Sequence, residues 1–289
     1  MSIAAGEVIV PGPVKISDDA EMWASDKVEI GEYTNILPGF EARCRSLHIG
    51  KHCRIHKNVH IGGGGCMGPN AHVWIGDYVG IYQNTTINCA EQVHIGDYVG
   101  IGQEVKIWTH GTWLPVAEGF PPQQQGSVRI GNKVWLPARC QVLAGVTIGD
   151  NVVVGINSLV NKDLPGGCFA AGMPAKVLKE NAYPNHLDDT TLLRVAADLC
   201  AEYRTIAHDK GFDPHVVAKI NVDVIHPGVY VWFQYMDEFI EFDLRHPELT
   251  NLHDISEYAE DFRDFLRRNG LKFYNGGFFR SMLPLRFAT

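Results

Sequence analysis

The sequence predicts a mainly β protein: a parallel β-helix built from six-residue units, followed by a small α+β domain. Three observations point to this. Aliphatic residues recur every six positions from Ile49 to Val160. Of the 30 glycines, 25 lie in residues 1–180. Residues 181–289 instead contain 17 of the 29 aromatic residues. The chain therefore divides into two compositional parts, with a boundary near residues 179–184.

The six-residue recurrence predicts a coil with triangular turns. It is neither the 3.6-residue period of a helix nor the two-residue period of a simple strand. One inward aliphatic residue beside a turn-permitting Gly builds one side, and three sides close a turn of 18 residues, as from Ile130 to Ile148. An antiparallel β-sandwich is the alternative, but it would not keep this register over consecutive units. The recurring positions are Ile49, Ile55, Ile61, Ile75, Ile81, Ile87, Ile95, Ile101, Ile107, Ile130, Leu136, Val142, Ile148, Val154 and Val160.

The same register locates insertions in the coil. The intervals Ile49 to Ile75, Ile75 to Ile95 and Ile95 to Ile130 are 26, 20 and 35 residues, which exceed one turn by 8, 2 and 17. Each excess follows the third aliphatic residue of its turn, so all excursions leave at one corner. Long loops in a regular domain are usually functional. We therefore expect the loops 62–72 and 109–127 to lie on one edge and to carry function.

Composition excludes several classes of protein. With 33 acidic against 25 basic residues the net charge is -8, so no global basic field would hold a nucleic acid. No run of about 18 apolar residues predicts a membrane span, and the amino end lacks the layout of a signal peptide. Seven cysteines without a short-spaced framework fit reduced thiols. We expect an intracellular, cytoplasmic protein without a nucleic-acid partner.

Residues 28–180 resemble the hexapeptide-repeat acyltransferases. The motifs that carry the resemblance are Ile130-Gly-Asn-Lys-Val-Trp135, Val146-Thr-Ile-Gly-Asp150, Asn161-Lys-Asp-Leu-Pro165 and Ala171-Gly-Met-Pro-Ala-Lys176. Within that family the chain is most similar to the maltose, galactoside and xenobiotic acetyltransferases and to sugar O-acetyltransferases of polysaccharide gene clusters. The resemblance implies a left-handed parallel β-helix, a homotrimer with active sites between neighbouring coils, and acetyl-CoA as the cosubstrate.

The resemblance assigns the general base to His110, at the start of the long loop. Acetyl transfer needs a base near the acceptor, and histidine suits this role because its unperturbed pKa is near 6.5. Many relatives place this His about two positions later. A loop histidine that only packs at a subunit seam is the alternative.

Three residues are assigned to acceptor binding: Asn84, Trp108 and Trp113. Asn84 lies in an Asn-x-Thr-Ile segment resembling that of the galactoside enzyme, whose acidic acceptor-binding residues correspond here to Cys89 and Ala90. An Asn that only caps a coil corner is the alternative. The two tryptophans flank His110.

The resemblance also implies which residues hold the cosubstrate. Trp135 matches the family's Asn-Val-Trp pattern, and Lys162, Lys176 and Lys179 stand where basic side chains surround the CoA phosphates. Backbone amides near the pantetheine arm come from Ala144, Gly145 and Ile156.

Two other patterns, a histidine series and a glycine run, are weaker evidence for a functional site. Four histidines recur at four-residue spacing: His48, His52, His56 and His60. In a helix they would lie on one side and suggest a metal site, but the register of the coil places them on different sides. We therefore expect no metal site. Gly62–Gly65 lacks the strand, helix and Lys of a phosphate-binding loop, so we interpret it as an excursion lining the acceptor cleft.

The expected domains are a lead-in segment (1–27), the β-helix (28–182) and an α+β accessory domain (183–289). Apolar spacing predicts a helix over 191–206, strands near 217–225, 229–236 and 238–244, and a second helix from about 253 to 268. The net charge of residues 181–289 is -6, which disfavours an acidic carrier protein and favours free acetyl-CoA as donor.

The predicted function is acetyl-CoA-dependent O-acetylation of a saccharide hydroxyl, in surface polysaccharide or glycoconjugate biosynthesis. N-acetylation of a nucleotide-linked amino sugar is one alternative. A non-catalytic or metal-binding β-helix is the other.

Overall fold

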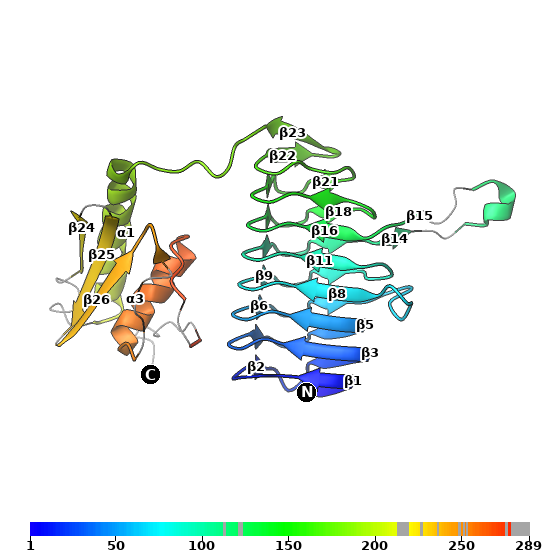
Figure 1. The fold of residues 1–289 in the computed structure, drawn as a ribbon, viewed down its shortest axis with the longest axis horizontal. Coiled ribbons are helices and arrows are strands. Elements are labelled where there is room, and N and C mark those ends of the chain that lie inside the picture. Colours follow the sequence, from blue (N-terminus) through cyan, green and yellow to red (C-terminus); the bar gives the residue numbers. More distant parts are fainter. Residues whose placement is uncertain are drawn as a thin grey trace. The chain divides into compact units, whose positions relative to one another are not determined.

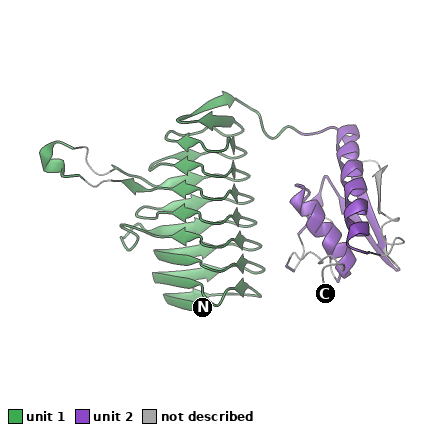
Figure 2. Ribbon diagram, turned by 180° about the vertical axis from the view of Figure 1, so that it is seen from behind, with its two compact units in different colours: residues 1–185 green, residues 186–289 purple. Residues whose placement is uncertain are grey.

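The computed structural model divides the chain into two compact units, Met1–Asn185 and His186–Thr289 (Figure 1, Figure 2). Unit 1 is a parallel β-solenoid of about eight turns, and unit 2 combines α-helices with a small sheet, so the predicted fold class is confirmed. The structure describes residues 1–111, 114–120, 124–212, 220–225, 228–235, 237–247, 250, 252, 254–274 and 277–278.

The strands of unit 1 form three flat faces, which we call A, B and C. Face A holds the later halves of β1 (Ser2–Ile9), β3 (Glu21–Ile30) and β5 (Glu41–Ile49), then β8 (His72–Ile75), β11 (Val93–Ile95), β16 (Val128–Ile130) and β19 (Thr147–Ile148). Face B holds β2 (Lys15–Ile16), β4 (Asn35–Ile36), β6 (Arg54–Ile55), β9 (Gly80–Ile81), β12 (Gly100–Ile101), β17 (Trp135–Leu136), β20 (Val153–Val154), β22 (Phe169–Gly172) and β23 (Ala175–Lys179). Face C holds the earlier halves of β1, β3 and β5, then β7 (His60–Ile61), β10 (Thr86–Ile87), β13 (Lys106–Ile107), β18 (Gln141–Val142) and β21 (Leu159–Val160).

The observed register is the one the aliphatic spacing predicts. On face A, Ile75 pairs in parallel with Ile49 and Ile95, and Ile130 pairs with Ile95 and Ile148. All five side chains are at most 1% exposed. The repeat therefore places one inward column on each face, and these columns form the core of unit 1.

The predicted excursions leave the coil at one corner, between faces C and A, which we call the loop corner. In the early turns β3 and β5 run round this corner within single strands. After β7 and after β13 the chain leaves the coil there. The second excursion begins with β14 (His110–Gly111), which pairs antiparallel with β15 (Gln124–Gln125), and it includes the short helix η1 (Val116–Glu118).

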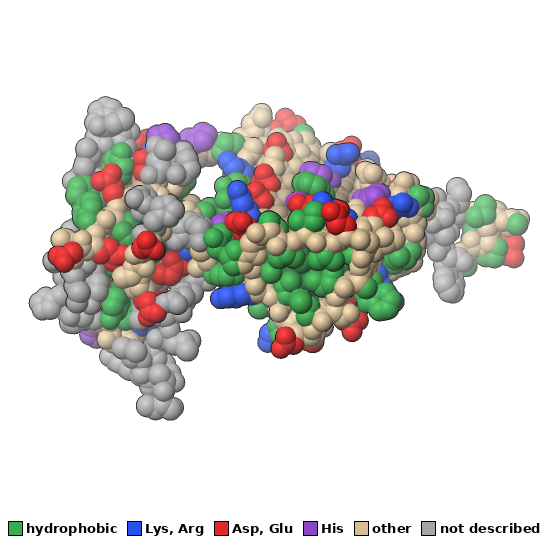
Figure 3. All heavy atoms as spheres, turned by 60° about the horizontal axis from the view of Figure 1, so that its bottom comes forward, with side chains coloured by type: hydrophobic (Ala, Val, Ile, Leu, Met, Phe, Trp, Pro, Cys, Tyr) green, Lys and Arg blue, Asp and Glu red, His purple; other side chains and the backbone are tan. Residues whose placement is uncertain are grey.

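The coil starts earlier than the sequence suggested. β1 already pairs in parallel with β3, so residues 1–27 form part of the coil rather than a lead-in. Met22 and Val28 are fully buried in the core. The Ile-Gly pairs that mark later turns do not occur in this segment, which is why the spacing gave no signal. Figure 3 shows hydrophobic side chains gathered at the β1 end of the coil.

Unit 2 contains α1 (Asp189–Asp209), the antiparallel strands β24 (Ile220–Ile225), β25 (Gly228–Tyr235) and β26 (Glu238–Asp243), and α3 (Glu257–Arg268). Each helix begins at a capping side chain. The Asp188 carboxylate accepts from the Thr191 amide at 2.7 Å, and Ser256 Oγ accepts from the Ala259 amide at 3.2 Å. Such caps satisfy amides that a helix start leaves unpaired.

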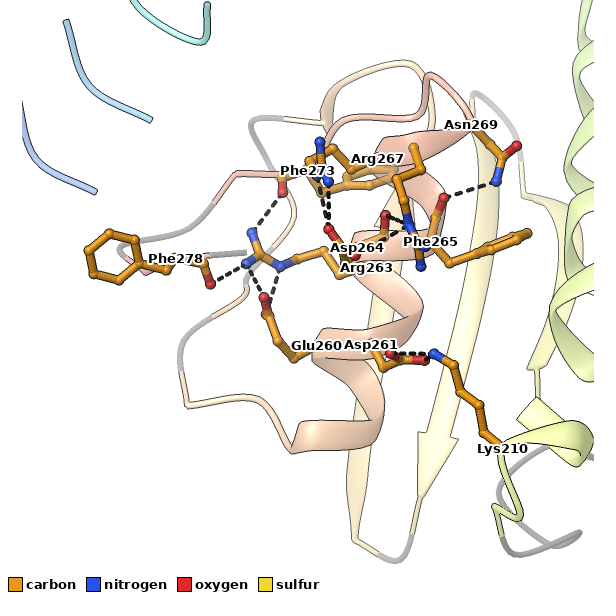
Figure 4. Close-up of polar contacts among 11 residues, drawn as sticks. Lys210, Glu260, Asp261, Arg263, Asp264, Phe265, Arg267, Asn269, Phe273 and Phe278 are labelled. Atoms are coloured by element: carbon orange, nitrogen blue, oxygen red, sulfur yellow. Dashed lines mark hydrogen bonds and ion pairs between the residues drawn. The ribbon is translucent and has the colours of Figure 1, made fainter. Parts of the chain in front are cut away.

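Charged side chains of α3 are buried within unit 2 (Figure 4). Asp261 is fully buried and accepts from Lys210 Nζ at 2.6 Å and from the Tyr203 hydroxyl at 3.1 Å. Arg263, also fully buried, donates to Glu260 at 2.6 Å and to the Phe273 carbonyl at 2.9 Å. Each of these buried charges has an opposite partner. The Lys210–Asp261 pair joins α3 to the end of α1, and the hydrogen bond from Arg263 to the Phe273 carbonyl joins α3 to the segment that follows it.

Among the described residues, no helix combines the length and the apolar character that crossing a bilayer requires.

Candidate active site

The loop corner brings His110 and Asn88 together. Asn88 follows β10 and His110 opens β14, and the register stacks Ile87 directly against Ile107. His110 Nδ1 lies 2.8 Å from Asn88 Oδ1. Asn88 is 1% exposed, whereas His110 is only partly buried. Asn88 was not among the predicted site residues, although the pairing of Ile87 with Ile107 could have identified it as the residue beneath the start of the loop.

The contacts of Asn88 determine which nitrogen of His110 carries a proton. Its amide nitrogen donates to the carbonyl oxygens of Gly62 at 3.1 Å and Gly64 at 3.3 Å. Both partners only accept, so the side-chain oxygen must face the imidazole. That oxygen also accepts from Thr109 Oγ1 at 2.7 Å. His110 Nδ1 is therefore the donor, and a neutral imidazole in this tautomer leaves Nε2 unprotonated, as a base requires.

The glycine run lies against the reactive side of His110. A Cβ added to Gly64 would lie 3.0 Å from His110 Nε2. The neighbouring glycines are equally close to the corner, because a Cβ at Gly63 would meet Asn88 Nδ2 at 3.0 Å and one at Gly65 would meet the Ala90 Cβ at 2.7 Å. Backbone without side chains thus borders Nε2, which leaves room there for a small group.

The return strand of the long loop connects this corner to the next turn. Gly126 donates its amide hydrogen to the Thr109 carbonyl at 3.0 Å. A Cβ added to Gly126 would lie 2.6 Å from the Gly145 Cα. The predicted cosubstrate residues Ala144 and Gly145 therefore lie at the loop corner, one turn from His110. Trp108 is near them in the coil, since its amide donates to the Val142 carbonyl at 2.9 Å, and it is 38% exposed.

Asn84 does not lie with His110. It occupies the corner between faces B and C in a left-handed conformation (φ 61°), and its side-chain oxygen accepts from Asn58 Nδ2 at 3.3 Å. Asn tolerates this conformation better than most residues, which matches the alternative of a corner residue. The side chain that the structure brings to His110 is Asn88, four residues further along the chain.

The remaining predicted cosubstrate residues are spread over the coil. Trp135, Lys176 and Lys179 belong to face B, Ile156 is 69% exposed and lies beside the corner between faces B and C, and Lys162 follows β21. Within one copy of the coil, Trp135 lies on face B and His110 lies at the corner opposite that face. The two residues are therefore on opposite sides of the coil. The predicted acceptor residue Trp113 lies outside the described residues.

The described residues contain no group of three His, Cys, Asp or Glu side chains arranged to hold a metal ion.

Three comparisons with known proteins place the repeats. Residues 127–162 match the model of the bacterial transferase hexapeptide family (six repeats). A 53-residue stretch, 18% of this chain and 26% of the relative, is 47% identical to the galactoside O-acetyltransferase of Escherichia coli K12. Another stretch, 57 residues covering 20% of this chain and 29% of the relative, is 44% identical to a putative lipopolysaccharide biosynthesis O-acetyl transferase of the same strain.

The chain is also similar to solved structures of acetyltransferases. A galactoside acetyltransferase in complex with coenzyme A is 30% identical, with 48% of this chain and 70% of that chain covered and a TM-score of 0.41. A hexapeptide-repeat acetyltransferase of Vibrio cholerae in complex with acetyl-CoA is 26% identical, with 46% and 70% covered and a TM-score of 0.39. The chain spans about a quarter to two fifths of the length of the curated relatives it matches.

The aligned Ile-Gly turns, the stacked inward columns and the family match over 127–162 lead to one conclusion: the coil of this chain is a hexapeptide-repeat β-helix, of the kind found in bacterial acyltransferases.

Proposed function

We propose that the chain is an acetyl-CoA-dependent O-acetyltransferase that acts on a saccharide hydroxyl, with His110 as the general base. The observation that carries this proposal is the 2.8 Å contact between His110 Nδ1 and Asn88 Oδ1, which leaves Nε2 basic and facing the glycine run. The names of the relatives, a galactoside and a lipopolysaccharide O-acetyltransferase, support the acceptor class. They also support a place in surface polysaccharide biosynthesis.

The proposed chemistry is a direct transfer. His110 Nε2 takes the proton of the acceptor hydroxyl while the hydroxyl oxygen attacks the thioester carbonyl carbon. The new carbon–oxygen bond forms, the carbon–sulfur bond breaks, and the imidazolium returns its proton to the departing CoA thiolate. Asn88 would stabilise the imidazolium, since Nδ1 remains a donor to Oδ1 throughout. It is thus a positioning residue.

The proposed cosubstrate residues lie partly at the loop corner (Ala144, Gly145, Lys162) and partly on face B (Trp135, Lys176, Lys179). An acetyl-CoA molecule that contacts both groups of residues would have to lie between the coils of two copies of the chain. This separation supports a homotrimer in which face B of one copy borders the loop corner of the next.

The experiment that tests the proposal is acetyl transfer by purified protein, followed through the free thiol of CoA. We expect His110→Ala to lower kcat by about 10²–10⁴-fold, the range for losing a general base. His208→Ala, which alters an exposed histidine of unit 2, is the control and should be as active as the wild type. Full activity of His110→Ala would refute the proposal.

The acceptor class needs a separate measurement. We expect mass spectrometry of products from a panel of neutral, acidic and amino sugars to show acetyl esters. Exclusive amide formation on amino sugars would contradict O-acetylation while leaving the role of His110 intact.

A further inference from the structure

A groove of about 310 Å³ runs along face A, next to the loop corner. Its floor includes the backbone of three strands at Leu47, Val73 and Val93, whose side chains point into the core. The outward side chains of face A stand in two columns beside this floor. None of the residues assigned above to the base, donor or acceptor lines it.

The first column consists of stacked rings. His48 pairs with Trp74, and Trp74 with His94, on successive strands. The centroids of Trp74 and His48 are 3.6 Å apart with nearly parallel planes, whereas those of Trp74 and His94 are 6.5 Å apart. Trp74 is 48% exposed. The indole therefore lies between two parallel imidazoles, closer to His48 than to His94, and its exposed part is the edge of the ring.

The second column offers hydrogen-bonding groups. Ser46 Oγ lies 2.6 Å from His72 Nδ1, and His72 Nε2 lies 3.2 Å from the Pro69 carbonyl. Because a carbonyl only accepts, Nε2 is the donor and Nδ1 accepts from Ser46. Gln92, in the same column, makes no side-chain hydrogen bond to the part of the chain that the structure describes. One side of the groove is thus aromatic and the other is polar, an arrangement suited to a sugar ring.

The charges at the two ends of the groove differ. At one end the Glu29 carboxylate is 2.8 Å from Lys27 Nζ and 3.4 Å from His48 Nδ1, so it is already neutralised. At the other end Arg129 extends from the strand beside His94 and is exposed. No carboxylate among the described residues lies within ion-pair distance of its guanidinium. Burial, and to a smaller extent Arg129, lowers the pKa of His94, which therefore adds no positive charge at neutral pH.

The groove and the candidate base share the loop corner. His72 and Gln92 are the first outward residues of face A after the chain returns from that corner. Immediately before Gln92, the Glu91 amide donates to Thr109 Oγ1 at 3.2 Å, and Thr109 precedes His110. A chain of sugars with one unit in the groove could therefore present its neighbour at the corner.

We propose that this groove binds a carboxylate-bearing sugar unit of the acceptor, with its C–H groups against the exposed edge of Trp74 and its carboxylate on Arg129. The inference rests on the proposed function and narrows its substrate class to acidic oligosaccharides. Aromatic rings bind the apolar face of a sugar, and the planar guanidinium matches a carboxylate in two parallel hydrogen bonds.

The test is binding to the full-length protein without acetyl-CoA, by calorimetry, so that it does not depend on turnover. The probes are trigalacturonate and a glucuronate-containing hyaluronan tetrasaccharide, each beside its carboxyl-reduced counterpart. We expect at least one acidic probe to bind about tenfold or more tightly than its reduced form, and Arg129→Gln to abolish this preference. Trp74→Ala should weaken binding of the acidic probe by about tenfold.

Two control variants match these changes. Trp23→Ala removes another exposed tryptophan of the coil, and Arg194→Gln removes an exposed arginine of α1; both should bind as the wild type does. All four variants should keep the wild-type affinity for acetyl-CoA and the wild-type oligomeric state by light scattering.

Several results would overturn the inference. One is equal binding of acidic and reduced probes, or of wild type and Arg129→Gln. A loss of acetyl-CoA affinity would make the groove a donor site, and a change in oligomeric state would make it a contact between copies. Failure of the proposed function is distinguishable, because full acetyl transfer by His110→Ala would refute that function whatever the groove binds.

Discussion

Asn88 holds His110 through its side-chain oxygen, because its amide nitrogen donates to the carbonyls of Gly62 and Gly64 and so turns the oxygen toward the imidazole. Removing that oxygen frees the imidazole to rotate and to change tautomer. We expect Asn88→Ala to lower kcat by about 10²-fold, with the KM for acetyl-CoA unchanged. A steady-state comparison checks this.

The variant Asn88→Asp distinguishes a role of Asn88 in orienting His110 from a role in packing alone. A carboxylate beside Nδ1 stabilises the imidazolium, so the acidic limb of the pH–rate profile should move to higher pH. If neither variant alters kcat or the pH profile while both fold normally by circular dichroism, Asn88 does not position the base.

Gly64 borders Nε2 closely enough that a methyl group should block the acceptor. We expect Gly64→Ala to lower kcat/KM for the acceptor by about tenfold or more, since a 1 Å displacement of reacting groups can cost 10²-fold. Gly111→Ala is the matched control, because a Cβ at Gly111 meets nothing within 4 Å. Equal kinetics for the two variants would contradict a substrate position beside Gly64.

Trp135 lies over Gly100 on face B, where a Cβ at Gly100 would come within 2.4 Å of the indole. Gly100→Ala should therefore displace this ring, shift tryptophan fluorescence and raise the KM for acetyl-CoA several-fold if Trp135 binds the donor. The paired position on the preceding strand supplies the control. Gly80→Ala would meet only Tyr82, at an ordinary 3.6 Å, and should leave both readouts unchanged.

Cys66, on the glycine-rich excursion, should be the first thiol to react with an alkylating reagent. It is the one cysteine of the seven that is not buried. Burial raises the pKa of Cys44 and Cys53 to about 12, so at pH 8 only ~10⁻⁴ of each is the reactive thiolate. We expect peptide mapping to show one fast label at Cys66 and a parallel loss of acetyl transfer. Cys66→Ser should resist that inactivation.

Asp261 should be the most sensitive charge of unit 2. Asp261→Asn leaves Lys210 without its buried partner, and we expect a loss of about 3 kcal/mol of unfolding free energy. Chemical denaturation followed by circular dichroism measures it. Asp209→Asn, at a surface position with a 70% exposed side chain, should change stability little. Similar losses for both would show that the Lys210 pair contributes no more than a surface contact.

The coil could be predicted almost residue by residue, because an inward position every six residues leaves little choice of register. The pairings of Ile49, Ile75, Ile95 and Ile130 are the predicted ones. Asn84 shows what the register does not determine: the structure places it at a coil corner with φ 61° and its side chain against Asn58, and its assignment to acceptor binding stays a prediction. Asn88 was missed because its role depends on the path of the glycine run, which no repeat determines.

The groove on face A could not be predicted from the sequence either. His48, Trp74 and His94 lie 26 and 20 positions apart, and only the register aligns them. The burial of Asp261 and Arg263 in unit 2 was equally hidden, since charged residues on a helix usually predict a solvated face.

At the loop corner the chain can vary in length while the strands of the coil keep their pairing. An insertion there adds residues outside the ladder of strands and leaves every inward pair in step, as the 35-residue interval between Ile95 and Ile130 shows. The residues that follow the glycine run in the first excursion, and the part of the second excursion beyond β14, could therefore be exchanged for other loops without moving the coil. Residues 62–65 have to stay, since the carbonyls of Gly62 and Gly64 orient Asn88 and, through it, His110.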